Sequence, residues 1–514
     1  MPHVFRTDTV SLLAALVLIG CAATRPAASA ASPAVAGDAR VERFRQQVES
    51  NRERLGIPGL SVAVIENGQL LWTEGFGYAD VENRVPVAPD TLFHLASVTK
   101  TFTAILTLQL VEQGKLDLDA PVSRYVPEIK DDRVRIKHLL SHTSEGTPGD
   151  AFNYNPERFE HLKTIIEQVT GKPLRQVFVE TFLDPLGMRD SVPGPDVVDD
   201  PAKWAVLGAS NLERYRQVLP RLAKPYTYYG DGEIVRTTSP EADFWASAGL
   251  LSTARDMAKY DAAVDRHVFL SPTMQQRAWT PFLSNAGKPL PGGLGWFVTD
   301  YRGERLVWHF GHWGTGYSAM YLKIPARHLT VVMLANSEAL ADHHYQVGEE
   351  ITHNIMGCDF IDTFVPEVSD ASYRSSLSPA ALATELQKAR DATPKHPYAG
   401  PSPDCERTSR IALEEWIADR RSQARTIVPL DPALAAVYAG RYQFPTRVAA
   451  ITDEGGRLFL AMADGTRSEL FAQSPAQLFL KIRPWTMTFV RKGGKVVRID
   501  LLDRGDTYKL ARVP

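Results

Sequence analysis

The sequence has few cysteines and no long run of charge of one sign, and these absences exclude several classes of protein. Three of the 514 residues are cysteine, and 57 Lys and Arg nearly balance 60 Asp and Glu, for a formal net charge of -3. Without a lysine- or arginine-rich run, no nucleic-acid partner is expected. Hydrophobic residues make up 44% of the chain, which is enough to bury large cores, and the length indicates more than one domain.

Motifs of several enzyme classes are also absent. The chain contains no Gly-x-Ser-x-Gly elbow and no phosphate-binding glycine loop. The sequence therefore does not support a hydrolase with a nucleophile elbow or a nucleotide-binding enzyme. The polar residues 342–344 (Asp-His-His), Glu349, Glu350 and His353 do not follow an established metal-ligand spacing. Neither a metal site nor a cofactor is expected.

The N-terminal residues 1–21 are interpreted as an export signal. Their apolar stretch 10–20 is too short to cross about 30 Å of hydrocarbon as a helix. It ends in Leu-Ile-Gly-Cys21, which resembles the bacterial lipoprotein cleavage box and would place a membrane anchor on the lipidated Cys21. A signal ending in Ala-Ser-Ala at residues 28–30 is the alternative. In both cases the protein leaves the cytoplasm for the periplasm or cell envelope, and the Ala-, Pro- and Ser-rich residues 22–38 form a flexible tether.

The two remaining cysteines are Cys358 and Cys405. An oxidising compartment permits them to form a disulfide. Two free buried thiols agree with the sequence equally well, so both states stay open.

Residues 39–365 are predicted to form one layered α+β domain. Residues 59–65, the turn Asn67-Gly68 and residues 69–75 are typical of a β-hairpin. Further strands are predicted at 306–310, 317–324 and 329–335, and helices at 158–170 and 253–263. Because strands at both ends enclose a helical middle, we expect an antiparallel sheet flanked by helices, with a helical region inserted.

The character of the sequence changes beyond about residue 370. Residues 366–430 are predicted to be a helical connecting segment, with a helix start at Ser378-Pro379 and an amphipathic stretch at 405–424. Residues 431–514 contain short alternating runs separated by glycine-containing turns. This pattern predicts a small antiparallel β-domain.

The segment Ser97-Val-Thr-Lys100 carries the candidate chemistry. Apolar periodicity over 102–111 predicts a helix with Ser97 in its first turn and Lys100 one turn along the same face. A serine hydroxyl is a weak nucleophile, and a lysine can take its proton only if burial or nearby positive charge lowers the lysine pKa. The helix N-terminus supplies some of that positive charge. Four residues alone form a weak motif.

Two other segments hold candidates for the same site. Tyr154, in Phe-Asn-Tyr-Asn-Pro156, can shuttle protons between Ser97 and a leaving group if it lies beside a lysine. His312 stands among glycines at the start of an apolar strand, whose backbone N–H groups can bind an oxyanion together with the Ser97 N–H. A core tyrosine and a tight turn with an aromatic plug are the alternatives.

These motifs resemble those of the penicillin-recognising serine hydrolases, in particular the class C β-lactamase-like group. The resemblance also rests on residues 59–64 (Gly-Leu-Ser-Val-Ala-Val), 138–144 (His-Leu-Leu-Ser-His-Thr-Ser) and 248–256. The resemblance covers about residues 40–360. It implies an acyl-enzyme on Ser97, with Lys100 assisting its deprotonation. It also implies that residues 431–514 form a lipocalin-like domain.

The same resemblance assigns the other site residues. Tyr154 corresponds to the tyrosine of the family's Tyr-x-Asn motif. His312 corresponds to the lysine or histidine of Lys-Thr-Gly or His-x-Gly. The N–H of Thr315, which follows Gly314, would then join that of Ser97 in the oxyanion hole.

Two departures from the family pattern bear on the substrate. Pro156 replaces the asparagine of Tyr-x-Asn and has no amide to donate, and whether Asn153 or Asn155 compensates stays open. His312-Trp313 offers a mostly neutral imidazole at pH 7 where β-lactamases present a lysine cation to the substrate carboxylate. Both changes favour an esterase-like or amidase-like hydrolase over an efficient β-lactamase.

The sequence therefore predicts an exported serine hydrolase that acts on a small-molecule ester, an amide or a short peptide. A D-amino-acid peptidase or β-lactamase of the cell envelope is the alternative within the enzyme class. A non-catalytic envelope protein that uses the same fold to bind a ligand is the alternative from another class.

Overall fold

The structure is a computed structural model that describes residues 37–230, 232–237, 244–341, 350–368, 384, 405–444, 448–462, 467–483, 485–503 and 506–514. The predicted export signal with Cys21, most of the tether and the helix start at Ser378-Pro379 lie outside these residues. Within the described ranges, no helix is both long enough and apolar enough to cross a membrane.

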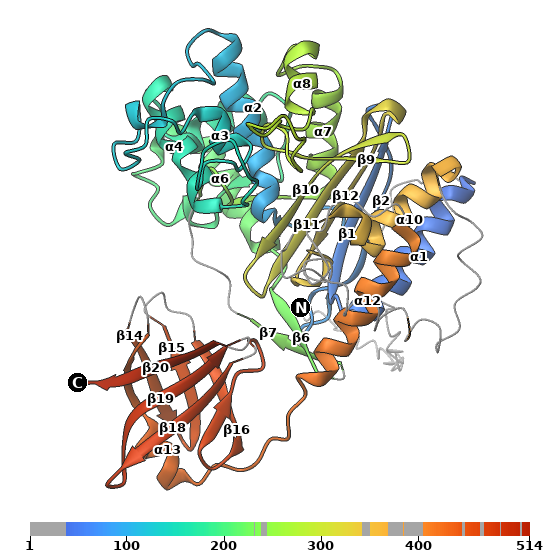
Figure 1. Ribbon diagram of the computed structural model, residues 1–514. Coiled ribbons are helices and arrows are strands. Elements are labelled where there is room, and N and C mark those ends of the chain that lie inside the picture. The colour runs from blue at the N-terminus through green and yellow to red at the C-terminus, as the bar shows by residue number, and fades with distance from the viewer. Residues whose placement is uncertain are drawn as a thin grey trace, which may run out of the picture.

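A seven-stranded sheet forms the centre of the larger part of the molecule (Figure 1). Its strand order is β3-β2-β1-β12-β11-β10-β9, and its neighbouring strands are antiparallel. The strands are β1 (Gly59–Glu66), β2 (Gln69–Asp80), β3 (Val85–Pro86), β9 (Phe297–Tyr301), β10 (Glu304–Trp313), β11 (Tyr317–Ile324) and β12 (Leu329–Ala335). Asn67 and Gly68 both have positive φ, as the turn of the predicted hairpin requires. Because β1 pairs with β12, distant parts of the chain share one sheet, and the predicted α+β class is confirmed.

Helices from the middle of the chain cover one face of this sheet (Figure 1). They are α2 (Thr99–Glu112), α3 (Ile136–Leu140), α4 (Pro156–Thr170), α5 (Leu174–Phe178), α6 (Ala209–Val218), α7 (Ala254–Asp265) and α8 (Pro272–Ala278). Ala63, Val307 and Tyr321 from the sheet share a core with Phe102 of α2 and Tyr260 of α7. The ring of Phe102 stacks on that of Tyr260, with centroids 3.8 Å apart.

Three helices from the two ends of this domain cover the other face of the sheet. They are α1 (Ala39–Leu55), α10 (Ile355–Phe364) and α12 (Cys405–Ser422). Phe44 of α1 and Trp416 of α12 are buried here against Val62 and Trp308 from the sheet. A disulfide between Cys358 and Cys405 joins α10 to α12, which decides the state that the sequence left open. The amphipathic stretch predicted as part of a connector is therefore a packed layer of the fold.

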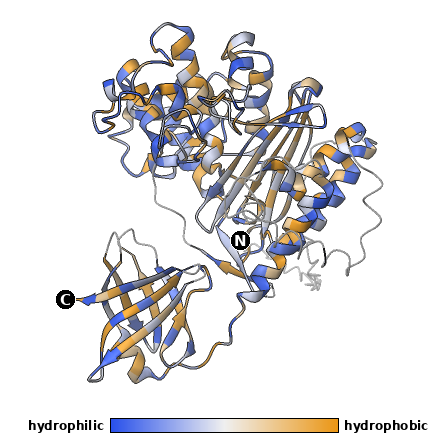
Figure 2. Cartoon of the chain, viewed as in Figure 1, coloured by the Kyte–Doolittle hydropathy of each residue, from blue (hydrophilic) through white to orange (hydrophobic). Residues whose placement is uncertain are grey.

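The C-terminal strands close into a separate barrel after the short helix α13 (Pro432–Tyr438). The strands are β13 (Gly440–Gln443), β14 (Val448–Glu454), β15 (Arg457–Ala461), β16 (Arg467–Ser474), β17 (Gln477–Phe479), β18 (Thr486–Lys492), β19 (Lys495–Asp503) and β20 (Asp506–Val513). Hydrophilic and hydrophobic residues alternate along them (Figure 2), as expected for strands with one face in a core. Tyr442, Leu478 and Phe489 belong to that core, which is distinct from the two around the large sheet.

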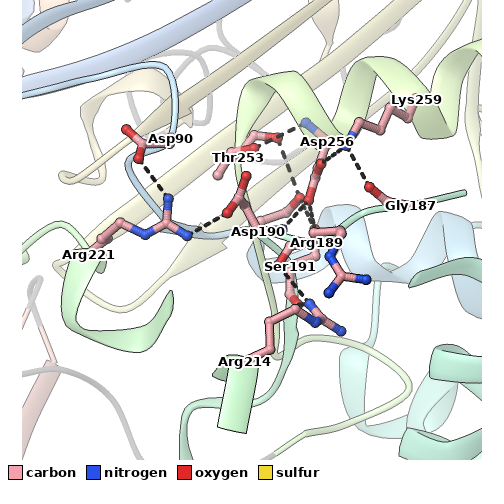
Figure 3. A network of polar contacts seen from close by, with 11 residues as sticks. Asp90, Gly187, Arg189, Asp190, Ser191, Arg214, Arg221, Thr253, Asp256 and Lys259 are labelled. Atoms are coloured by element: carbon pink, nitrogen blue, oxygen red, sulfur yellow. Dashed lines mark hydrogen bonds and ion pairs between the residues drawn. The ribbon is translucent and has the colours of Figure 1, made fainter. Parts of the chain in front are cut away.

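A buried polar network fixes the start of α7 (Figure 3). The fully buried Asp256 accepts hydrogen bonds from the Asp190 N–H (2.8 Å), the Ser191 hydroxyl (2.9 Å) and Lys259 Nζ (2.7 Å). Thr253 caps the helix by accepting from the Asp256 N–H. These bonds compensate the cost of burying a carboxylate. The network therefore fastens α7 to the segment around residue 190.

Candidate active site

A small sheet holds the chain just before Ser97. It consists of β4 (Phe93–His94), β8 (Leu250–Ser252) and β5 (Val192–Pro193), with β8 in the middle. The Leu95 N–H donates to the Leu250 carbonyl over 2.9 Å. The buried network of Figure 3 adjoins both β5 and β8, so it also steadies the segment that leads to the nucleophile.

Ser97 lies in the 3-10 turn η1 (Ala96–Val98), which leads directly into α2. The preceding residue, Ala96, has a φ of 48°, in the left-handed region that L-residues rarely adopt. The Ala96 N–H donates to Nδ1 of the buried His94 over 2.9 Å. Strained backbone of this kind persists only where surrounding contacts hold it. These contacts hold the backbone of the turn that carries Ser97.

Lys100 lies beside Ser97, as the predicted helical spacing requires. Its Nζ is 2.9 Å from Ser97 Oγ and 2.9 Å from the Ser247 carbonyl oxygen. The Lys100 side chain is fully buried. Burial lowers its pKa to about 7, against the opposing effect of the Glu160 carboxylate. Near neutral pH a large fraction of Lys100 is therefore uncharged and able to accept a proton from Ser97.

Tyr154 completes the group around Lys100. The centre of its ring is 5.1 Å from Lys100 Nζ, and its hydroxyl is buried. The ring packs between His142, 4.5 Å away, and Phe297, 5.8 Å away. Burial and the charge of Lys100 lower the pKa of His142 well below its usual value, so this imidazole is neutral. The structure therefore brings Ser97, Lys100 and Tyr154 together.

Strand β10 approaches the nucleophile at Gly311. A Cβ atom on Gly311 would lie 2.2 Å from the Leu95 carbonyl oxygen and 3.1 Å from Ala96 Cβ. Side chains alternate along a strand, so His309 and Trp313 share the face of Gly311. The His309 ring is 6.2 Å from that of Tyr154. Burial, and to a smaller extent the charge of Lys100, lowers the pKa of His309 to about 3, so this imidazole is also neutral.

His312 lies on the same strand, where it pairs with Ser318 of β11 and alternates to the face opposite Gly311. Gly314 and Thr315 follow in the turn between β10 and β11. The roles predicted for these three residues stay predictions. His309-Phe-Gly311 repeats the His-x-Gly pattern of His312-Trp-Gly314 three residues earlier. The sequence contained this signal but could not show which of the two glycines meets Leu95.

An aromatic cluster lies beside the nucleophile turn. The ring of Trp313 is 4.9 Å from that of His94 and 5.4 Å from that of Trp245. Burial lowers the pKa of His94 to about 3. Trp245 and Trp313 are half-buried. This side of the site therefore presents aromatic rings and an uncharged imidazole.

Pro156 has a local structural explanation. It occupies the first position of α4, where its missing N–H costs nothing, and Asn155 caps the helix by accepting from the Arg158 N–H over 3.0 Å. The side-chain amide of Asn155 donates to Glu145 over 2.9 Å, and that of Asn153 donates to the same carboxylate. The side-chain amides of Asn153 and Asn155 thus both bind Glu145. The oxygen that accepts a hydrogen bond from Lys100 is the Ser247 carbonyl.

Among the residues that the structure describes, no cluster of three or more His, Cys, Asp or Glu side chains could hold a metal ion. His353 lies in the short helix η8 (Ile351–His353) and is buried, and Glu350 accepts from Thr299. Residues 342–349, which include the other polar residues of that segment, lie outside the described ranges.

Comparisons with known proteins agree with this geometry. The Beta-lactamase family model matches residues 43–349. Penicillin-binding protein 4* of Bacillus subtilis (strain 168) is 24% identical over 470 residues, which are 82% of this chain and 87% of that protein. Protein flp of Staphylococcus aureus (strain MW2) is 25% identical over 340 residues, 56% of this chain and 61% of that protein. The octameric penicillin-binding protein homologue from Pyrococcus abyssi has the same fold, with a TM-score of 0.53 and 21% identity over 91% of this chain and 99% of that one.

The range of the family model spans more than half of the 514 residues and contains Ser97, Lys100 and Tyr154. Its members are serine hydrolases, and a serine with a buried lysine at hydrogen-bond distance is the arrangement that such chemistry needs. The chain therefore belongs to the beta-lactamase family of serine hydrolases.

Proposed function

We propose that this protein is an esterase-like hydrolase that cleaves an ester or amide with an uncharged acyl group, through an acyl-enzyme on Ser97. The observation that carries the proposal is the site wall in which Trp313 packs on the neutral His94 and on Trp245. Aromatic rings favour apolar groups and offer no charge to a carboxylate. Anionic β-lactams are therefore expected to be poor substrates.

Acylation begins with proton transfer from Ser97 to the uncharged form of Lys100, across the 2.9 Å contact. Ser97 Oγ attacks the substrate carbonyl carbon, and the carbonyl oxygen becomes an oxyanion. Tyr154 relays the proton from Lys100 to the leaving alcohol or amine, and the carbon–oxygen or carbon–nitrogen bond breaks. Water then gives up a proton to Lys100 and attacks the acyl carbon. The bond between that carbon and Ser97 Oγ breaks, Oγ takes the proton back from Lys100, and the acid is released with Ser97 restored.

The oxyanion needs N–H donors that point at it before the reaction begins. We infer that one is the Ser97 N–H and the other a backbone N–H of β10 beside Gly311. Two observations support this inference. Gly311 comes close to the Leu95 backbone. The pairing of β9 with β10 ends at Trp308, so β10 continues past its neighbour toward η1.

We also propose that the protein is exported and anchored through a lipid on Cys21. The disulfide between Cys358 and Cys405 supports export, because disulfides persist mainly in oxidising compartments. Cell fractionation of wild type and Cys21→Ala tests the anchor. Wild type should be in the membrane fraction and the variant in the soluble one. Equal distribution of the two would contradict lipidation.

A D-amino-acid peptidase or β-lactamase of the cell envelope is the second candidate. It is favoured by similarity over 82% of this chain to a protein named penicillin-binding protein 4*. In that case a bound penicillin should remain on Ser97 for a long time or be turned over quickly.

Intact-protein mass spectrometry separates the candidates. Wild type, Ser97→Ala and Tyr154→Phe are incubated with a fluorophosphonate and, separately, with a penicillin, and a neutral p-nitrophenyl ester is assayed alongside. We expect a phosphonate adduct on wild type, none on Ser97→Ala, slower labelling of Tyr154→Phe, and ester turnover well above penicillin turnover. A long-lived penicilloyl adduct would support the peptidase. No adduct from either reagent would overturn the hydrolase and support a ligand-binding protein.

A further inference from the structure

We propose that Glu160 is a positioning residue, which holds the Ser247 carbonyl against Lys100 and places a negative charge behind the base. It does so from α4, the helix that begins at Pro156, where the family's asparagine is missing. The inference rests on the role of Lys100 in the proposed function. In this proposal two factors set the protonation state of Lys100, its burial and the charge of Glu160.

The contacts form one continuous chain from α4 to the nucleophile. Glu160 Oε2 accepts hydrogen bonds from both the N–H and the hydroxyl of Ser247, each over 3.0 Å. The Ser247 carbonyl accepts from Lys100 Nζ, which in turn contacts Ser97 Oγ. Ser247 is 2% exposed. The bonds from Glu160 therefore hold the residue whose carbonyl contacts Lys100.

A carboxylate at this place needs compensation. Burial raises the pKa of Glu160, and the hydrogen bonds from the Ser247 and Ala246 backbone oppose that rise. Removing a carboxylate from water is costly unless hydrogen bonds or an opposite charge balance the cost. Here hydrogen bonds come from Ser247, and the positive charges that act on Glu160 are Lys163 and the protonated form of Lys100. The two side chains are thus coupled through one buried residue, Ser247.

Glu160 is the charged neighbour that acts on Lys100 against the larger effect of burial. The titratable side chains around Lys100 are Glu160 on α4, His142 after α3, Tyr154 just before α4 and His309 on β10. Both imidazoles are uncharged because burial lowers their pKa values. Burial raises the pKa of Glu160, and the hydrogen bonds from Ser247 and then the charge of Lys163, also on α4, act against that rise.

The sign of the effect follows from these charges. Burial lowers the Lys100 pKa to about 7, and the Glu160 carboxylate acts in the opposite direction. Removing that negative charge should lower the Lys100 pKa further. The amine would be uncharged at lower pH but would also be a weaker base. A purely structural clamp would change stability and leave the pH dependence alone.

Glu160→Gln removes the charge and retains an oxygen that can accept from Ser247. The matched control is Glu167→Gln on the same helix, whose carboxylate accepts from the Leu174 N–H. The rate of fluorophosphonate labelling of Ser97 is measured from pH 5 to 9. We expect the acid limb of Glu160→Gln to move to lower pH by about one unit, the size expected when one neighbouring charge is removed. The control should follow wild type. Glu160→Ala, which also releases Ser247, should lose at least tenfold in rate at every pH.

A second measurement reads Lys100 without catalysis. The chain is labelled with carbon-13 at lysine Cε, the Lys100 signal is identified by its loss in Lys100→Arg, and it is titrated in wild type and Glu160→Gln. The variant should titrate at lower pH than wild type. Equal titration curves and equal labelling profiles would overturn the role of Glu160. If wild type is not labelled at all, the hydrolase proposal fails, while the titration still decides whether Glu160 acts on Lys100.

Discussion

Lys100 should give the reaction its pH dependence. Only its uncharged form can accept the Ser97 proton, and burial lowers its pKa to about 7. The rate of acylation should therefore rise through pH 7 and level off above it. The rate of phosphonate labelling of wild type, measured from pH 5 to 9, tests this rise. A rate that stays flat over that range would show that Lys100 is not the base.

The conservative variant Lys100→Arg serves as the control for this prediction. Its guanidinium stays protonated across the whole range, so it cannot accept the proton. Labelling should fall by about 10³-fold, within the usual contribution of a general base. An arginine variant that retains the wild-type rate would point to another group as the base.

Gly311 should be required for the position of Ser97. A methyl group there would lie 2.2 Å from the Leu95 carbonyl oxygen, and a backbone atom cannot move as freely as the end of a side chain. Gly311→Ala should therefore push β10 and η1 apart and reduce Ser97 labelling at least 100-fold. The measurement is the labelling rate together with a thermal unfolding curve.

Gly303→Ala is the matched control on the turn before β10. Gly303 has a φ of 89°, but nothing lies within 4 Å of its added Cβ. It should cost about 1 kcal/mol of stability and leave labelling unchanged. If both variants label at the wild-type rate, Gly311 does not position the nucleophile.

The individual residues of the site could be predicted only in part. Ser97 and Lys100 are close in sequence, so helical spacing alone places their heads together. His309 and His312 both precede a glycine by two residues, and only the packing of β10 on Leu95 distinguishes them. Glu160 looks like any polar residue of an amphipathic helix. Its contact with Ser247 joins residues 87 apart in the chain, and no local pattern reports such a contact.

The sequence predicts individual helices and strands better than it predicts which other elements they pack against. The Asn67-Gly68 turn between alternating residues predicted the β1–β2 hairpin, and the structure confirms it. The amphipathic pattern at 405–424 predicted a helix, which is α12. The pattern could not show that its apolar face lies on the large sheet, because periodicity identifies a buried face without identifying what covers it.

A buried ion pair should fasten α7 to the sheet. Lys323 of β11 and Asp261 of α7 are both fully buried, with Nζ and Oδ1 2.9 Å apart, and Lys323 also contacts Asp265 over 2.7 Å. Lys323→Met would leave two carboxylates without their cation. The free energy of unfolding should fall by about 3–5 kcal/mol. Urea unfolding followed by tryptophan fluorescence measures the change.

The double variant Lys323→Met with Asp261→Asn tests the cause. An uncharged amide is less costly to bury than an unpaired carboxylate, so the double variant should recover part of the lost stability. If the single variant unfolds within about 0.5 kcal/mol of wild type, as surface substitutions do, the pair does not hold the two elements together.

At the scale of the whole molecule, the described residues form three hydrophobic cores, two around the sheet and one in the barrel. The β6–β7 hairpin (Tyr226–Tyr229 and Glu233–Arg236) contacts both the sheet domain and the barrel. At its base, Gly316 lies so close to Pro225 that a Cβ would be 2.6 Å from the proline Cβ. At its other end, the Tyr229 ring lies 6.1 Å from that of Phe479, and Lys481 pairs with Glu233 over 2.6 Å. The hairpin thus touches both the turn after His312 and the barrel.

The barrel should nevertheless fold on its own. Its strands close into a barrel, and the described residues of its core, together with the hydrophobic residues packed against them, all lie between Val428 and Leu510. Its contacts with the hairpin include an ion pair and a ring contact, and partly polar contacts of this kind are usual between domains that fold independently. A fragment of residues 427–514 should therefore show a β-type circular dichroism spectrum and unfold cooperatively in urea.

The complementary fragment 37–426 should label on Ser97 at the wild-type rate within about twofold. A 427–514 fragment without a cooperative transition would show that the hairpin is part of the barrel's folding unit. Loss of labelling in 37–426 would show instead that the barrel supports the active site through the hairpin.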